Sequence, residues 1–582
     1  MAFDGIVTKS VVMELGNCLI NGKINKIFEP NKNEILLGLY SNSKNYALNI
    51  CIDSNNYRVH LSTNSKPNPL NAPNFCMLLR KHILGYKIKN ISSYDLERII
   101  IIDLEGYNEL NDLTTKKLII ELMGKHSNIV LVNDKDFIID SLRHLDISSN
   151  SYRDILPAHS YVFPDNNKHS FLKLNNYAEF KNILLELPIT NTINNSIANS
   201  FIGFSISFVN NVIKILNIDK NISLSNISDN VLQRVYIYIQ KILSNINTNK
   251  VSIKSIINEK NKNDYVIDYI DKTSNLEINF YLDDFYYSKE LNETFLSYRN
   301  NILRLIFSEL SKYSTRIKNI DKKLLECSNR DLYKLYGELI TANLYKYRTE
   351  NLTTISLENY YDNNNLITIP LDSKISIHKN ATKYFKKYNK LKNALEIVSN
   401  QKKEAKKDIN YLESIVYELE NSKTISDLNE IYNELSQSDI FSDHLSKKNN
   451  KNSNKKTDTS SLSPREFKVE EYTVLVGKNN IQNDYLTTKL ADKNDIWFHT
   501  KDIHGSHVIL KTNNTLEIDD NILVKCAEIA AFYSKAKLSS NVPVDYCFAR
   551  YVKKPSGSKP GMVIYTNNKT LNVLPIDPTI SC

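Results

Sequence analysis

Two heptad seams in the middle of the chain constrain its fold more than any other feature. Apolar residues recur at alternating spacings of three and four over residues 303–324, and again over residues 384–419. A sustained 3.5-residue repeat predicts helices that pack knobs-into-holes against a partner helix. A compact insert over 351–380 separates the seams, so an antiparallel hairpin with a small tip is simpler than pairing with a second chain. Lys402 alone breaks the second seam.

The regions around these seams predict a multidomain α+β protein. Residues 1–172 alternate short Ile-, Val- and Leu-rich runs with turn residues, which indicates a mixed α/β domain, whereas residues 173–285 are mostly helical in pattern. The first long helix, over 286–350, is expected to span on the order of 90 Å. The remaining expected parts are the tip insert over 351–380, a second long helix over 381–442, a flexible basic linker over 443–465 and a second mixed α/β domain over 466–582.

Individual elements are predicted within the two mixed domains. In the first domain we expect one helix over 74–84 and strands at 34–40, 46–52, 57–61, 98–104, 117–123 and 128–133. In the second we expect one helix over 519–535 and strands at 470–476, 506–510, 544–552 and 561–565.

Composition argues against several classes of function. The 582 residues include only 13 glycines, and neither a P-loop nor a dinucleotide-binding fingerprint occurs. Serine-hydrolase and catalytic-cysteine signatures are also missing, so we expect neither an enzyme nor a cofactor. Seven scattered cysteines without a CxxC pair fit reduced thiols in a cytosol. No apolar run is long enough for a signal peptide or a membrane span, which predicts a cytoplasmic protein that does not engage a membrane.

The charge balance favours acidic partners only weakly. There are 74 Lys and Arg against 65 Asp and Glu, a net charge of +9, which fits binding to phosphates. A coding bias toward Asn, Ile, Lys and Tyr explains the excess equally well. The segment 550–559 carries four cations, Lys553 and Lys554 among them, on an expected loop that either contacts phosphate or is simply solvated.

The segment 495–507, DIWFHTKDIHGSH, holds the only tryptophan and three of the eleven histidines. The histidine spacing matches no helix-face zinc motif, so a metal site is not expected. Trp497 and Phe498 offer stacking faces for bases, and three neighbours offer hydrogen bonds to phosphates or bases, namely His499, Lys501 and His507. The alternative interpretation is a buried strand end followed by a polar loop.

The first domain has its own candidate cations. Arg80 lies on the expected helix, Lys125 and His126 lie between two strands, and Arg98 opens a strand beside Glu97. An acid–cation pair at a strand end is often an exposed ion pair worth under about 1 kcal/mol. These residue types alone do not favour a binding site over such an ion pair.

Several long motifs, in one order along nearly the whole chain, resemble the NFACT family. They are PNFCMLLRKHILG (73–85), ELMGKHSNIVLVN (121–133), GELITANLY (337–345), NATKYFKKYNKLK (380–392), VGKNNIQNDYLT (476–487), DIWFHTKDIHGSHVIL (495–510) and VKKPSGSKPGMVIY (552–565). The resemblance implies an NFACT-N domain over 1–172, a helix-hairpin-helix region over 173–285, a coiled-coil hairpin with a middle tip domain, and an NFACT-R domain over 466–582. It also implies a first domain similar to the formamidopyrimidine-type DNA glycosylase fold, without the N-terminal proline nucleophile.

The resemblance further implies a ribosome-associated quality-control factor. Bacterial members of the family bind large ribosomal subunits that carry a stalled nascent chain, recruit alanyl-tRNA and support untemplated C-terminal alanine tailing. The expected partners are therefore large-subunit rRNA and stalk-base proteins, tRNA-Ala, the peptidyl-tRNA nascent-chain complex and an RqcP-type helper protein. Peptide-bond chemistry belongs to the ribosome, so no catalytic residue is expected.

The family's tRNA-contacting acid–arginine pair corresponds to Glu97 and Arg98, where Glu97 replaces the usual Asp. The other expected tRNA contacts are Arg80, Lys125 and His126, and the expected rRNA contacts are Trp497, His499, Lys501, His507, Lys553 and Lys554. Some family names suggest instead a fibronectin-binding surface adhesin. That function would need an export route, for which the sequence offers no signal.

Overall fold

The structure is a computed structural model, and it describes residues 3–108, 110–145, 153–188, 190–258, 261–270, 277–347, 352–441, 463–515 and 517–578. The chain divides into two compact units, residues 1–292 and 293–582, which are described separately. Most of the predicted basic linker, and the predicted end of the first long helix at 348–350, lie outside the described residues. Within the described residues, no helix is both long and apolar enough to cross a membrane.

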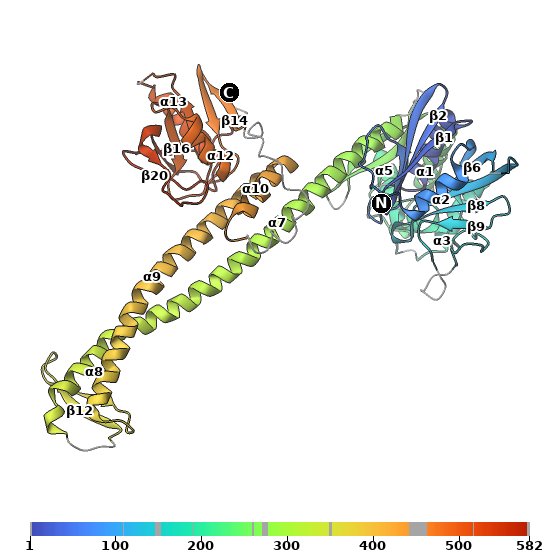
Figure 1. The fold of residues 1–582 in the computed structure, drawn as a ribbon. Coiled ribbons are helices and arrows are strands. Elements are labelled where there is room, and N and C mark those ends of the chain that lie inside the picture. The colour runs from blue at the N-terminus through green and yellow to red at the C-terminus, as the bar shows by residue number, and fades with distance from the viewer. Residues whose placement is uncertain are drawn as a thin grey trace. The chain divides into compact units, whose positions relative to one another are not determined.

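The first unit is built on a nine-stranded antiparallel sheet in the order β4-β3-β2-β1-β5-β6-β7-β8-β9. Figure 1 draws its strands in blue to cyan. Its strands are β1 (Lys23–Asn31), β2 (Glu34–Ser41), β3 (Lys44–Cys51), β4 (Arg58–Leu61), β5 (Lys87–Ser93), β6 (Ile99–Tyr107), β7 (Leu113–Glu121), β8 (Asn128–Asn133) and β9 (Ile138–Ser141). Helices α1 (Gly5–Leu19) and α2 (Asn74–Ile83) pack on this sheet. All six predicted strands and the predicted helix over 74–84 coincide with elements of the structure, while α1, β1, β5 and β9 were not expected.

The rest of the first unit is a helical layer that shares the core of the sheet. It comprises α3 (Tyr177–Leu185), α4 (Ile193–Ser200), α5 (Ile206–Ile215), α6 (Asp229–Asn247) and the hairpin β10 (Val251–Ile257) to β11 (Asn263–Tyr269). One apolar cluster runs from Phe3 in the first segment to Tyr286 in the last, so the predicted boundary at residue 172 does not separate two cores. The expected mostly helical pattern of residues 173–285 is thus joined by one β-hairpin that was not expected. Val251, Tyr265 and Ile267 of this hairpin join the cluster.

Long helices that end in a small tip make up much of the second unit, and the first of them begins within the last residues of the first unit. The first helix is α7 (Glu277–Ser328), 52 residues or roughly 78 Å, and a separate α8 (Arg330–Ala342) follows it. The predicted single helix over 286–350 is therefore interrupted after residue 328. Tip strands β12 (Thr354–Asn359) and β13 (Asn365–Pro370) precede α9 (Ile377–Asn421) and α10 (Ile425–Gln437).

Contacts between α7 and α9 show that these helices run antiparallel (Figure 1). Ile302 and Ile306 of α7 share an apolar cluster with residues late in α9, whereas further along α7 Asp321 pairs with Lys402, with the two charged atoms 2.5 Å apart. In the tip, α8 approaches α9 so closely that a Cβ at Gly337 would lie 2.9 Å from the Phe385 ring. The seam-breaking Lys402 is thus paired with an acid across the hairpin.

The C-terminal domain of the second unit is a six-stranded antiparallel sheet in the order β14-β15-β17-β16-β18-β21. Its strands are β14 (Arg465–Val469), β15 (Tyr472–Val476), β16 (Ile496–Thr500), β17 (Val508–Lys511), β18 (Val542–Phe548) and β21 (Lys569–Val573), beside a short pair, β19 (Val552–Lys553) and β20 (Ile564–Tyr565). Helices α12 (Asn480–Tyr485) and α13 (Asp520–Phe532) complete it. One apolar cluster includes α13 and Phe498, and another includes Trp497, because successive residues of β16 face opposite sides of the sheet.

Candidate nucleic-acid interfaces

The first candidate interface lies at the sheet edge where β6 begins. Arg98 immediately precedes β6, and its carbonyl accepts a hydrogen bond of 2.8 Å from the Leu122 N–H, just beyond the end of β7. The Arg98 guanidinium donates to the Tyr57 hydroxyl at 3.1 Å, and its central carbon lies 5.8 Å from the centre of that ring. Glu97 is buried and accepts a short hydrogen bond from the Asn166 side chain. The structure therefore holds Arg98 at the surface and Glu97 behind it.

Two glycines fix the backbone that precedes this pair. A Cβ on Gly5, at the start of α1, would lie 1.9 Å from the Leu96 carbonyl oxygen, and one on Gly203 would lie 2.0 Å from the same atom. Gly203 also adopts a φ of +78°, which residues with side chains rarely adopt. The Gly5 N–H donates to the Gly203 carbonyl at 2.9 Å. Three segments distant in sequence thus converge directly behind Glu97 and Arg98.

A further cation at this edge, Lys168, was missed by the sequence analysis. Burial and the positive charge of Arg98 lower the pKa of Lys168, while Glu97 opposes that effect. The Lys168 ammonium donates to the Ala198 carbonyl at 2.8 Å. Two cations around one buried acid leave a net positive edge suited to an anion. Lys168 follows a short Asn-rich run in the sequence, which carries no recognisable signal.

Lys125 and His126 belong to the same edge. They lie on the short 3-10 turn Gly124–His126, three and four residues after Leu122, and both are exposed. The Arg143 guanidinium donates to the backbone carbonyls on both sides of His126, at 3.3 Å to Lys125 and 3.1 Å to Ser127, and so supports this turn.

Arg80 lies elsewhere. Its Nε and Nη2 atoms both donate to the Ile27 carbonyl of β1, at 2.9 and 2.7 Å, which ties α2 to the sheet. Its guanidinium also lies 5.8 Å from the Phe28 ring centre. These contacts indicate a structural role for Arg80, and a tRNA contact at this residue stays a prediction.

In the C-terminal domain, the expected stacking residues are buried. Trp497 and Phe498 both have 0% exposed surface, so neither offers a free face to a base, and the alternative of a buried strand end describes both rings better. His499 stacks on Trp497, and the His507 Nδ1 atom lies 2.7 Å from the Thr487 hydroxyl. Burial lowers the pKa of His499 to about 4 and that of His507 to about 3. Both imidazoles are therefore neutral near pH 7 and cannot neutralise phosphate, although they can still form hydrogen bonds.

The expected cations of this domain are at the surface. Lys501, Lys553 and Lys554 are exposed, and the Lys554 ammonium forms an ion pair with Asp484. The second unit also contains a cavity of about 520 Å³, which is bordered by Trp497, His499 and Tyr565 among other residues, but by none of these three lysines. The domain thus has exposed lysines and, separately, a cavity with aromatic walls.

Comparison with known proteins identifies the family. Residues 4–457 match the NFACT N-terminal and middle domains, and residues 465–567 match the NFACT protein RNA binding domain. The chain belongs to the NFACT family. It is 35% identical to the Rqc2 homolog RqcH of Bacillus subtilis (strain 168), over 100% of this chain and 99% of that protein. It is 32% identical to the Rqc2 homolog RqcH of Streptococcus suis (strain 05ZYH33), over 100% of this chain and 99% of that protein. A solved structure of the C-terminal part of the fibronectin/fibrinogen-binding protein from Streptococcus suis matches with 31% identity and a TM-score of 0.38, over 49% of this chain and 98% of that one.

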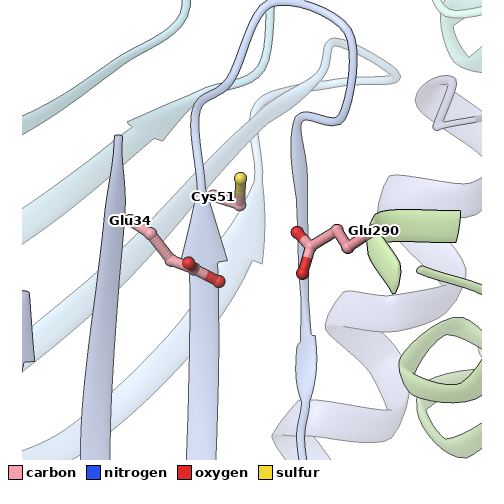
Figure 2. Close-up of side chains that lie close together, drawn as sticks. All are labelled: Glu34, Cys51 and Glu290. Atoms are coloured by element: carbon pink, nitrogen blue, oxygen red, sulfur yellow. The ribbon is translucent and has the colours of Figure 1, made fainter. Parts of the chain in front are cut away.

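One cluster in this NFACT protein has the residue types of a metal site. Glu34 of β2, Cys51 of β3 and Glu290 of α7 converge, with their ligand atoms within 4.8 Å of one another (Figure 2). However, the Lys66 ammonium lies 2.6 Å from Glu34 and 2.7 Å from Glu290, and the buried Arg58 guanidinium also pairs with both acids. Two cations already balance two carboxylates, and burial raises the pKa of the Cys51 thiol, which disfavours the thiolate a metal needs. The cluster is therefore better described as a set of ion pairs that link α7 to the sheet than as a metal centre.

Proposed function

We propose that this NFACT protein is a cytoplasmic ribosome-associated quality-control factor that binds stalled large subunits and supports alanine tailing of their nascent chains. The observation that carries the proposal is its 35% and 32% identity to two Rqc2 homologs along the full length of both chains. The match of residues 465–567 to an RNA-binding domain adds RNA as a partner. Its other proposed partners are tRNA-Ala, the peptidyl-tRNA nascent chain, stalk-base proteins and an RqcP-type helper.

The proposed tRNA surface is the sheet edge that bears Arg98. Its planar guanidinium can pair with a phosphate or a base edge through two parallel hydrogen bonds, which a lysine cannot reproduce. Lys125 and His126 extend the positive surface, and Lys168 adds charge beside Arg98. Glu97 is a positioning residue, because its buried carboxylate holds the Asn166 side chain. The protein binds and positions tRNA, and the ribosome forms the peptide bond.

Purification of the tagged protein from cells, with sequencing of the copurified RNA, tests this function. We expect large-subunit rRNA together with one dominant tRNA, tRNA-Ala. Arg98→Ala should lose most of the tRNA while rRNA is retained, and Arg98→Lys should recover little, because the ammonium cannot form two parallel hydrogen bonds. Lys44→Ala is the matched control, since it removes one exposed cation from the first residue of β3. If Arg98→Ala and Lys44→Ala recover equal amounts of tRNA, the proposed role of Arg98 in tRNA binding is refuted.

A further inference from the structure

Within the second unit, the C-terminal domain contacts α9 and α10 through polar pairs in which the donor or cation always belongs to the domain. The amides of Asn479 and Gln482 donate to the Glu430 carboxylate at 2.7 and 2.9 Å. The Asn480 amide donates to the Ser414 hydroxyl at 3.1 Å and to Glu434 at 3.3 Å. Two further contacts have the same direction, the ion pair of Lys559 with Asp408 and the approach of His504 to Glu413 at 3.7 Å. In each contact the domain supplies the donor or cation, and the helices supply an acidic or hydroxyl acceptor.

Apolar packing contributes little to this contact. In the described part of the chain, the apolar cluster formed by α7, α9 and α10 includes no residue of the C-terminal domain. The two apolar clusters of that domain likewise include no residue of these helices. A hydrogen bond or a half-exposed ion pair typically contributes a net stabilisation of only about 0.5–1.5 kcal/mol, because water replaces it when the contact opens. A contact that rests on such pairs can open without disrupting either core.

Two buried carboxylates make the closed contact less stable near neutral pH. Glu418 and Glu434 are 7% and 3% exposed, and in the described residues an oxygen of each has no hydrogen-bond partner. Burial raises the pKa of Glu434 to about 7 and that of Glu418 well above its usual value, and their mutual repulsion adds to the latter shift. The facing groups are the Tyr411 hydroxyl and the Asn480 amide, which favour the charged form of Glu434, and Asp484, which disfavours it. Opening the contact would hydrate both acids.

The same contact forms part of the wall of the aromatic cavity. Asn410, Tyr411 and Ser414 of α9 form one wall of the 520 Å³ space, and the C-terminal domain forms the rest, including Trp497. The Trp497 Nε1 atom is buried and has no hydrogen-bond partner among the described residues. The volume lies within the roughly 300–1,000 Å³ range of small-ligand sites, so the cavity has room for a nucleobase.

We propose that this face of the C-terminal domain binds single-stranded RNA, and that the acids of α9 and α10 occupy it in the free protein. The inference deepens the proposed function, because it rests on the RNA-binding role of this domain. Amide and ammonium donors match phosphate oxygens and base acceptors. The buried Trp497 indole N–H in the cavity can donate a hydrogen bond to an acceptor on the edge of an unstacked base. Asp408, Glu413, Glu430 and Glu434 present carboxylate oxygens to the donors that phosphate would engage, so RNA and the helices compete.

A competition assay on the full chain tests this inference. The double variant Asp408→Ala, Glu430→Ala removes two acids that contact the domain, and alanine preserves the helices. We expect it to bind a labelled single-stranded RNA about fivefold to tenfold more tightly than the wild type in fluorescence anisotropy, as the loss of roughly 1–1.4 kcal/mol of competing contact would give. The control Glu396→Ala, Glu404→Ala removes two exposed acids from α9 away from these contacts, with the same change in net charge.

Hydrogen exchange supplies a second readout. Saturating RNA should accelerate amide exchange in residues 408–418 of the wild type, because α9 loses its cover. If the wild type binds RNA but the double variant matches its control, or exchange over 408–418 is unchanged, the inference is wrong and the proposed function stands. If neither the wild type nor any variant binds RNA, the RNA-binding role itself fails, and the inference fails with it.

Discussion

Replacing Gly5 with alanine should distort the candidate tRNA-binding edge. The added Cβ would lie 1.9 Å from the Leu96 carbonyl oxygen and 2.6 Å from the Gly203 Cα. Both are backbone atoms that cannot rotate aside, so α1 or the start of β6 must move. Such overpacking costs about 1–3 kcal/mol, and loss of the Gly5–Gly203 hydrogen bond adds about 1 kcal/mol. We therefore expect Gly5→Ala to destabilise the first unit by about 2–4 kcal/mol.

Gly16 in the same helix provides the matched control. A Cβ there would meet only the Ile20 side chain, at 4.0 Å, an ordinary contact. Alanine is favoured over glycine inside a helix by about 0.5–1 kcal/mol, so Gly16→Ala should stabilise the unit. The same chemical change at two positions of α1 is thus expected to have opposite signs.

Urea unfolding and hydrogen exchange would measure both effects. The only tryptophan, Trp497, lies in the second unit, so its fluorescence serves as an internal reference whose midpoint should not change. Amide exchange in β6 reports the first unit directly, and it should accelerate in Gly5→Ala and slow in Gly16→Ala. Recovery of tRNA should fall in Gly5→Ala, because Arg98 follows Leu96 by two residues. Equal exchange in β6 for Gly5→Ala and the wild type would refute the reasoning.

Two further predictions concern buried charge. Arg58→Met should lower the free energy of unfolding of the first unit by about 3–5 kcal/mol, because Arg58 is 1% exposed and pairs with Glu34 and Glu290. A shift of the urea midpoint equivalent to less than about 1 kcal/mol would contradict this prediction. For Glu434, burial raises the pKa from 4.5 to about 7, so its proton stabilises the second unit below about pH 4.5, and that stability is lost as pH rises through about 7. The Glu434→Gln side chain stays neutral at every pH. The thermal midpoint of this variant, followed by Trp497 fluorescence, should therefore exceed that of the wild type at about pH 8 and vary less with pH. The same pH profile in both proteins would contradict the raised pKa of Glu434.

The sequence predicted strands well where apolar runs alternate with turn residues. The strand-like runs in the first 133 residues all coincide with strands of the sheet. Helix α1 was missed because it is buried along most of its length, including Thr8, Ser10 and Glu14, and a helix without a polar face shows no helical periodicity. The β10–β11 hairpin was missed because it follows a long helical run, where its short alternating segments do not stand out.

The candidate tRNA edge was predictable only in part. Arg98 and Glu97 were found through resemblance, and composition alone favoured an ordinary ion pair. The structure shows a different arrangement, with Glu97 bound to Asn166 and Arg98 bound to Tyr57. Those partners lie 69 and 41 residues away in sequence, so no local pattern could reveal them.

The tryptophan segment shows why residue type alone misjudged the second interface. Trp497 and Phe498 are neighbours, and two aromatic residues before a polar loop resemble an exposed stacking platform. In a strand, however, successive side chains face opposite sides, and this sheet carries an apolar cluster on each side, so both rings are buried. Trp497 could then contact a base through the cavity that α9 residues line. The nearby ion pair of Lys559 with Asp408 of α9 joins residues 151 positions apart in sequence. Because residues of this distant helix line the cavity, the proposed competition predicts that any base contact at Trp497 depends on whether the domain and the helices are in contact.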